Sequence, residues 1–251
     1  MCAQFTLKSE ANALSKKWGI RIPQNLDSKN WELRVRGFMK IDLAPVIYAP
    51  NDKELSLKEM CFSLCPTWSA EFPFKWSTYN ARMNRPSKDP KKVEYIYQVP
   101  TWREAFAKGM TCLIPMNSAI ESSYFGSHAG NMIHFSTKSK DEVYVVGLYS
   151  PWVDKNTGEI HDTFTLITDD PYNFFFDCGH DRSVFVINEN SVDQWLKDRT
   201  MKPQERYQFL KKNRINLDWN VAIDRPLAKG WEKRKPTIEE INSISIWETQ
   251  E

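Results

Sequence analysis

The pattern of hydrophobic and polar positions along this chain of 251 residues predicts mostly β-strands. Between Trp31 and Met39, apolar residues alternate with charged ones, which is typical of a strand with one buried face. The polar turns at 51–53 and 156–158 separate neighbouring strands. Further segments with strand-like composition are 4–8, 44–49, 58–64, 133–136, 143–149, 163–168 and 184–187.

Helix signals are fewer and lie between these strands. Thr101 and Glu104 have the spacing of a capping box, and Gly19 and Gly109 are typical helix ends. Beyond Trp219 the chain is loop-like until a short helix near its end. The predicted helix starts are Ser9, Thr101, Ser191, Pro203 and Thr237.

An apolar run from Cys112 to Ile120 ends in the carboxylate of Glu121. Burial of a carboxyl group raises its pKa towards the range that is useful for proton transfer. The ordinary alternative is a glutamate in solvent just beyond a strand. Similarly, His180 precedes a buried segment, where an imidazole could exchange a proton near neutral pH or serve only the structure.

The second residue, Cys2, would become the amino terminus if Met1 were removed. It would then carry an α-amine of pKa about 7.7–8.0 and a thiol of pKa about 8.5 two carbons apart. An aldehyde condenses with such an amine to an imine, and the thiolate can close on the imine carbon to give a thiazolidine. The plain alternative is an ordinary residue in a frayed terminus.

Composition narrows the setting. A net charge of +2 makes the chain only mildly basic, so a nucleic-acid surface would have to come from local clustering. Five cysteines, an odd number at low density, indicate a reducing compartment. No signal peptide or membrane span is visible, and we expect a protein that is not secreted, cytoplasmic in a bacterium or phage host or nuclear in a eukaryote.

Two segments have the composition of a nucleic-acid surface. Residues 65–76 contain Trp68 and Trp76 in a loop without periodicity, and these rings could stack on unpaired bases or cover the edge of the core. Between Arg82 and Lys92 there are five basic residues and one acid, which could bind phosphates or merely be solvated.

A zinc site is a further possibility that the sequence supports weakly. Its ligands would be Cys61, Cys65, Cys178 and His180, but the spacing matches no recognised finger pattern. We therefore expect no metal and no cofactor.

Taken together, the order of the short motifs resembles the SOS response-associated peptidase family, whose members recognise abasic sites in single-stranded DNA. The resemblance runs from residue 1 to about residue 220. The motifs that carry it are Met1-Cys2, Asn80-Ala81-Arg82, the 100–104 segment followed by 112–115 and Glu121, then 164–168 and His180-Asp181-Arg182.

The resemblance implies a role for each residue of a reaction centre. Cys2 would be the nucleophile that traps the ring-opened sugar aldehyde as a thiazolidine, and Asn80 would position the reacting terminus. Glu121 would be the general acid and base for ring opening and imine formation. His180 would shuttle a proton to or from the sugar hydroxyl.

The resemblance also implies DNA contacts and shows departures. Arg82 would hold a flanking phosphate, Trp68 would be a stacking wedge, and Arg85 belongs to the basic segment. Gln4 stands where the family usually has an arginine that contacts phosphate. Ala3 and Ser122 replace the usual glycine and the aromatic residue after the glutamate.

The fold implied by the resemblance is α+β, a single domain built on a curved, barrel-like mixed β-sheet with peripheral helices. We expect this domain at 1–220, followed by a C-terminal extension at 221–251 that docks on it. The partner would be single-stranded DNA that contains abasic sites, and the protein would act as a monomer without contact with a membrane.

Two other functions remain open at this point. A cysteine peptidase or amidohydrolase could use the same terminus on an amide, and its turnover would depend on Cys2. A non-covalent binder of single-stranded DNA would instead bind equally well after Cys2→Ala, with Gln4 and Ser122 marking a drift away from catalysis.

Overall fold

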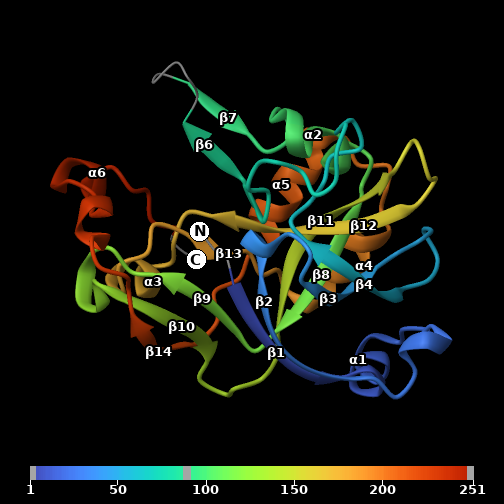
Figure 1. Ribbon diagram of the computed structural model, residues 1–251, viewed down its shortest axis with the longest axis horizontal. Helices are drawn as coiled ribbons and strands as arrows, with labels where there is room; N and C mark the ends of the chain where they lie inside the picture. The colour runs from blue at the N-terminus through green and yellow to red at the C-terminus, as the bar shows by residue number, and fades with distance from the viewer. Residues whose placement is uncertain (1–3, 87–91, 248–251) are drawn as a thin grey trace.

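The centre of the molecule is a closed ring of five strands. A computed structural model describes residues 4–86 and 92–247 (Figure 1). The ring closes because β12 pairs with β11 on one side and with β4 on the other, and the pairing of β12 with β4 is parallel while the others are antiparallel. The ring strands are β11 (Val143–Val153), β8 (Thr111–Met116), β3 (Leu43–Tyr48), β4 (Ser56–Phe62) and β12 (Ile160–Asp169).

A second sheet of five strands is antiparallel throughout, in the order β14-β10-β9-β1-β2. Phe5 of this sheet lies edge-on to Phe62 at 5.3 Å between ring centroids, and Phe62 stacks on Phe164 at 5.0 Å. All three side chains are fully buried, so the two sheets share one apolar core. Its strands are β1 (Gln4–Glu10), β2 (Asn30–Arg36), β9 (Ser118–Ser122), β10 (Asn131–Thr137) and β14 (Trp219–Pro226).

The predicted α+β class with a barrel-like mixed sheet is therefore confirmed. Short strands complete it: β5 and β13 add to β12, while β6 and β7 form a separate hairpin that projects from the body (Figure 1). Their bounds are β5 (Asn80–Arg82), β6 (Asn84–Pro86), β7 (Val93–Tyr95) and β13 (Ser183–Val184). The helices are α1 (Ala11–Trp18), α2 (Pro100–Ala107), α3 (Asn173–Asp177), α4 (Val192–Lys197), α5 (Pro203–Asn213) and α6 (Ile238–Asn242).

Three of the predicted helix caps do not form. Ser9 belongs to β1 and pairs with Trp31, so α1 begins only after Glu10. The carboxylate of Glu104 binds the side chains of Thr67 and Lys108 and does not close a capping box with Thr101. Ser191 does stand at the N-cap position of α4, as predicted, but its side chain caps no backbone N–H because its hydroxyl contacts the amide oxygens of Asn188 and Asn213.

Two strand predictions also need correction. The apolar run 112–121 is two strands, β8 and β9, which belong to different sheets. The chain after Trp219 is not a loop, because β14 pairs with β10 over seven residue pairs and continues across position 220. The helix expected from Thr237 is confirmed, since the Thr237 side chain accepts the backbone N–H of Glu240 in a capping box.

Candidate functional site

The carboxylate of Glu121 lies inside the protein near the end of β9. Its residue pairs with Ile133 of β10, and the preceding Ile120 pairs with Gln4 of β1. Glu121 is 4% exposed, although a buried ionised carboxylate is costly unless it has an ionic or hydrogen-bonding partner. A partner is therefore to be expected within contact distance.

That partner is His180, which follows α3 in a tight turn. Gly179 has a left-handed φ of 90°, and a Cβ atom built there would lie 1.7 Å from the carbonyl oxygen of Phe125. Only glycine fits this position. The turn is held by the backbone N–H of His180, which donates to the carbonyl of Phe175 at 3.0 Å. This turn places the imidazole of His180 next to the carboxylate of Glu121.

The two side chains form a buried acid–base pair. The Nε2 atom of His180 lies 3.4 Å from Oε2 of Glu121, and both side chains are 4% exposed. The Nδ1 atom lies 3.3 Å from the carbonyl oxygen of Ser122, which can only accept, so Nδ1 carries the hydrogen. The contact between Nε2 and the carboxylate is an ion pair when the imidazole is protonated. The pair therefore places an acid and a base in direct contact.

The pKa of Glu121 corrects the sequence expectation. Burial raises the pKa, as expected, but the surrounding positive charges, first among them that of His180 and least that of Arg182, outweigh burial, and the pKa lies below its ordinary value. Burial likewise disfavours ionised Asp181, yet Arg182 and His180 hold the pKa of that carboxyl well below its usual range. The site thus contains ionised carboxylates that are balanced by neighbouring cations.

His180 lines a cavity of about 560 Å³. The wall also includes Gln4 from β1, Tyr79 just before β5, and Arg182. Glu121 stands behind this wall, since its two neighbours along β9, Ile120 and Ser122, line the cavity while its own carboxylate contacts His180. A ligand in the cavity would therefore meet the imidazole first, and the carboxylate would act through it.

Asn80 lies on β5, which runs parallel to β12. Both its amide nitrogen and its amide oxygen are buried, and neither has a hydrogen-bond partner within the described residues. Arg82 of β5 pairs in register with Thr168 of β12. The Nε atom of Arg82 and the hydroxyl of Thr168 are also buried without a hydrogen-bond partner among the described residues. Buried polar atoms without partners are costly, about 1–3 kcal/mol each, and such a group is typical of a site that binds a ligand.

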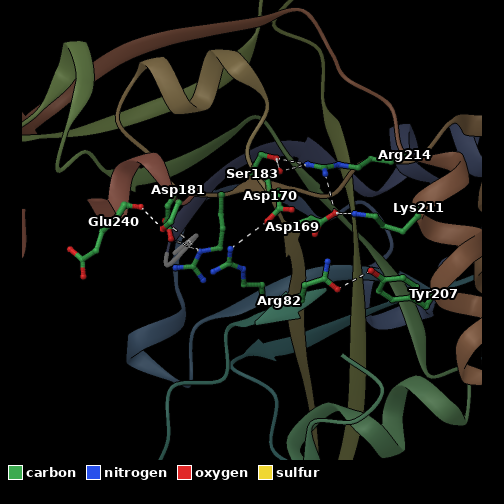
Figure 2. Close-up of polar contacts among 12 residues, drawn as sticks. Arg82, Asp169, Asp170, Asp181, Ser183, Tyr207, Lys211, Arg214 and Glu240 are labelled. Atoms are coloured by element: carbon green, nitrogen blue, oxygen red, sulfur yellow. Dashed lines mark hydrogen bonds and ion pairs between the residues drawn. The ribbon is translucent and has the colours of Figure 1, made fainter. Parts of the chain in front are cut away.

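Arg82 reaches towards the turn that carries His180. Its Nη2 atom lies 3.5 Å from Oδ1 of Asp170, a contact drawn in Figure 2. Its charge also contributes to the low pKa of Asp181. Burial and Asp169 raise the pKa of Asp170, against the opposite effect of Arg82. Arg82 thus lies close enough to the turn at 179–182 to affect its charge, whereas Asn80 does not line the cavity.

Of the remaining predicted DNA contacts, Trp68 and Arg85 do not line the cavity. Trp68 is 54% exposed on its loop and lies edge-on to Phe74 at 5.5 Å. Arg85 is on the projecting hairpin and pairs with Glu94 at 2.7 Å. Gln4 does line the cavity, and its amide oxygen accepts from Nε of Arg34 at 3.0 Å. All three assignments as DNA contacts stay predictions.

The predicted nucleophile Cys2 lies outside the described residues. Among residues 4–86 and 92–247, no three histidine, cysteine or acidic side chains are grouped so as to hold a metal ion. The zinc alternative with Cys61, Cys65, Cys178 and His180 therefore lacks a site there. None of the helices in these ranges has the length and apolar composition needed to cross a membrane.

The sequence predicts no role for most of the residues that line the cavity, among them Tyr79 and Arg234. Arg182 was noticed only as part of a motif, although it lines the cavity and lies 3.3 Å from Asp181. Its position two residues after His180, on entry into β13, could have indicated that it shares the site. Nothing in the local sequence around Arg234 indicates such a place.

Solved structures with a similar fold come from two bacteria. A protein from Bacteroides thetaiotaomicron is 18% identical, covers 98% of this chain and 100% of its own, and has a TM-score of 0.67. A protein from Bordetella bronchiseptica is 16% identical over 89% of this chain and 100% of its own, with a TM-score of 0.66. A phage-related protein from the same species is 12% identical over 89% and 94%, with a TM-score of 0.59.

At these identities the structural likeness concerns the fold alone. A search of curated proteins found no match. The sequence profile described as SOS response associated peptidase (SRAP) matches residues 1–222, which is most of the chain. The resemblance read from the motifs is thereby confirmed, and the protein belongs to the SRAP family.

Proposed function

We propose that this protein recognises abasic sites in single-stranded DNA and traps them covalently through Cys2 after removal of Met1. The trapped lesion would be protected during the response to DNA damage. The observation that carries the proposal is the buried pair of His180 and Glu121. His180 lines a cavity that is also lined by Gln4, two residues after Cys2 in the chain. Two trans peptide units keep the Cα atom of Cys2 within about 7 Å of that of Gln4.

The reaction has three steps, and protons move in each of them. The closed sugar is a hemiacetal, and opening it to the aldehyde takes a proton from the C1′ hydroxyl and gives one to the ring oxygen. The α-amine of Cys2 then adds to the aldehyde carbon, and protonation of the resulting hydroxyl lets it leave as water. The thiol sulfur finally bonds to the imine carbon while its proton goes to the imine nitrogen, which closes the thiazolidine.

The geometry of the pair suits these transfers. The Nδ1 atom of His180 faces the carbonyl of Ser122, so Nε2, which faces Glu121, is the nitrogen available for proton exchange. The pKa of Glu121 lies below its ordinary value, so an ionised carboxylate supports the imidazole in this exchange. Proton transfer by a positioned group of this kind typically contributes about 10²–10⁴-fold to a rate.

The unused hydrogen-bonding groups of Asn80 also support the proposal. Its buried amide offers two donors and an acceptor that no described residue uses, which suits a group that orients an amine or a sugar hydroxyl. Arg82 beside it carries a guanidinium that could hold a flanking phosphate in exchange for Asp170.

The test is mass spectrometry of the purified protein after incubation with a single-stranded oligonucleotide that contains one abasic site. We expect loss of Met1 and an adduct with the mass of protein plus DNA minus water, stable without a reductant. Cys2→Ala should abolish the stable adduct, although its α-amine would still form an imine that borohydride can trap. An adduct of equal stability in Cys2→Ala, or a mature protein that retains Met1, would overturn the proposal.

The name of the matched family favours one alternative, an amide-cleaving activity of the same terminus. The same experiment separates the two functions. A peptidase would release a cleaved product from a peptide library in a manner that depends on Cys2, and it would leave the abasic oligonucleotide unmodified.

A further inference from the structure

The chain beyond the family match takes part in the cavity. The match ends at residue 222, but four residues of the segment 231–244 line the same cavity as His180 and Gln4. In Figure 2, Glu240 of this segment and Asp181, which both line the cavity, are labelled on the left, away from Arg214. The four lining residues are Arg234, Pro236, Glu240 and Ile244.

The segment is anchored on the body before the cavity wall. The backbone N–H of Leu227 donates to the carbonyl of Gly130 at 2.8 Å. Gly130 has a left-handed φ of 89°, and a Cβ atom there would lie 2.9 Å from the indole ring of Trp231. The absence of a side chain at Gly130 therefore lets Trp231 pack directly on the turn before β10.

A second anchor follows the cavity wall. The backbone N–H of Trp247 donates to the carbonyl of Pro171 at 2.9 Å. Its indole lies edge-on to Tyr172 at 5.2 Å, and the guanidinium of Arg214 is 4.7 Å from its ring centroid. With both ends held, residues 231–244 form a fixed wall of the cavity.

The charged residues that line the cavity differ in whether an oppositely charged side chain lies beside them. Arg182 lies against Asp181, with Nε 3.3 Å from Oδ2. Arg234 is exposed, and its Nη1 donates to the hydroxyl of Tyr124 at 3.5 Å, while no described carboxylate lies within ion-pair distance. The Glu240 carboxylate accepts the backbone N–H of Thr237 at 2.8 Å, which holds it at the start of α6.

We infer that Arg234 binds a backbone phosphate of the DNA strand next to the lesion, and that the segment 231–244 is part of the DNA-binding site. The inference rests on the proposed function, because it takes the occupant of the cavity to be single-stranded DNA. A guanidinium presents paired N–H donors that match two oxygens of a phosphate. Arg234 presents these donors at the cavity that His180 lines.

The experiment measures non-covalent binding to an oligonucleotide with a tetrahydrofuran residue, an abasic-site analogue that has no aldehyde and cannot react with Cys2. Arg234→Ala should weaken binding about tenfold at low salt. The slope of log affinity against log salt should fall in magnitude by about 0.7, the value for one phosphate of a single strand. Arg234→Lys keeps the charge and should keep the slope.

Two further variants are matched to this one. Lys235→Ala removes an exposed charge that does not line the cavity, and it should leave affinity and slope near the wild-type values. Glu240→Gln keeps the capping box, since glutamine also serves at that position, and should tighten binding by removing a negative charge from the wall. Equal effects of Arg234→Ala and Lys235→Ala, or no effect of Arg234→Ala, would overturn the inference.

Failure of the inference is distinct from failure of the proposed function. If wild-type protein forms the stable adduct with a true abasic site and Arg234→Ala binds the analogue normally, only the role of Arg234 is refuted. If the wild-type protein forms no adduct, the proposed function falls whatever the variant does.

Discussion

Two buried ionic contacts lie near one another in this protein and differ in what surrounds them. Glu121 and His180 meet at 3.4 Å, and His180 lines the cavity. Asp169 and Arg214 meet at 3.0 Å with both side chains fully buried, and neither lines that cavity. The first is a weak acid facing a weak base, whereas the guanidinium of Arg214 never loses its proton.

Figure 2 shows the hydrogen bonds of the contact between Asp169 and Arg214, which use Oδ2 of Asp169, while its Oδ1 is buried without a hydrogen-bond partner among the described residues. Oδ2 of Asp169 also accepts from Lys211 at 2.8 Å. The Arg214 guanidinium donates to Ser183, to the carbonyl of Asp170 and to the Tyr172 hydroxyl, and the rings of Tyr172, Phe185 and Trp247 lie 4.5–5.0 Å from its central carbon.

The comparison teaches that burial of charge does not by itself indicate a reaction centre. In the Arg214 cluster every guanidinium nitrogen has a donor role, so it fixes the packing of β12, β13 and α5. In the Glu121 contact a titratable proton stands next to a cavity, so the same kind of burial can serve proton transfer.

The sharpest way to test the difference is to remove the acid of the reactive pair. Glu121→Gln keeps the shape of the side chain but removes the carboxylate that faces Nε2 of His180. We expect the rate of adduct formation to fall about 10²–10⁴-fold, measured by quenched time courses with abasic oligonucleotide. Unchanged binding of the tetrahydrofuran analogue is the control. A rate within threefold of wild type would refute the role of Glu121.

The converse change removes the base of the structural cluster. Arg214→Ala leaves the buried carboxylate of Asp169 without its main partner, and we expect a loss of about 3–5 kcal/mol in the free energy of unfolding. Urea denaturation measures it. Lys211→Ala is the control, since the Lys211 side chain is 28% exposed and should matter less. A loss below 1 kcal/mol for Arg214→Ala would mean that this cluster is not a structural anchor.

A smaller effect is expected from Trp247→Ala, which uncovers the Arg214 guanidinium. The cation–π contact at 4.7 Å contributes about 0.5–2 kcal/mol, depending on how far it is desolvated. Thermal unfolding monitored by circular dichroism should give a lower Tm. Trp247→Phe keeps an aromatic face and should recover part of the loss, and a Tm equal to wild type in both variants would argue against the contact.

The smallest expected effect is on the free energy of unfolding at acidic pH. The folded-state pKa of Glu121 lies below its ordinary value of 4.5, so its stabilising contribution is fully present above about pH 4.5 and is lost as pH falls through the lower folded value. Burial opposes this shift, and the neighbouring positive charges outweigh burial. Between pH 7 and pH 3, the free energy of unfolding should decline less in Glu121→Gln than in wild type. A steeper decline in the variant would reverse the sign.

The strands were the most predictable part of the fold. The alternation around Trp31 follows directly from one buried and one exposed face. The last strand, β14, was missed because it is an edge strand whose residues are mostly exposed, so no apolar period marks it. The caps at Ser9, Thr101 and Ser191 failed because strand pairing or other side-chain contacts take the place of the capping bonds.

The candidate site was predictable only through the family. Glu121 and His180 are far apart in the chain, and their contact depends on β9 and on the turn at Gly179, which no local pattern encodes. The pKa of Glu121 was predicted in the wrong direction because the sequence does not reveal that a cation lies beside it. The sequence also does not reveal that Arg234 lines the cavity, because an exposed arginine in a short basic run is usually only solvated.

The antiparallel pairing of Gln4 with Ile120 has a consequence for synthesis on the ribosome. At about 5–20 residues per second, β1 is made roughly 6–20 s before its partner β9 can join it. During that interval the pairing that encloses the start of β1 does not yet exist. An aminopeptidase that acts on nascent chains would therefore reach the initiator methionine before the sheet is assembled, and the order of translation itself would leave time for processing.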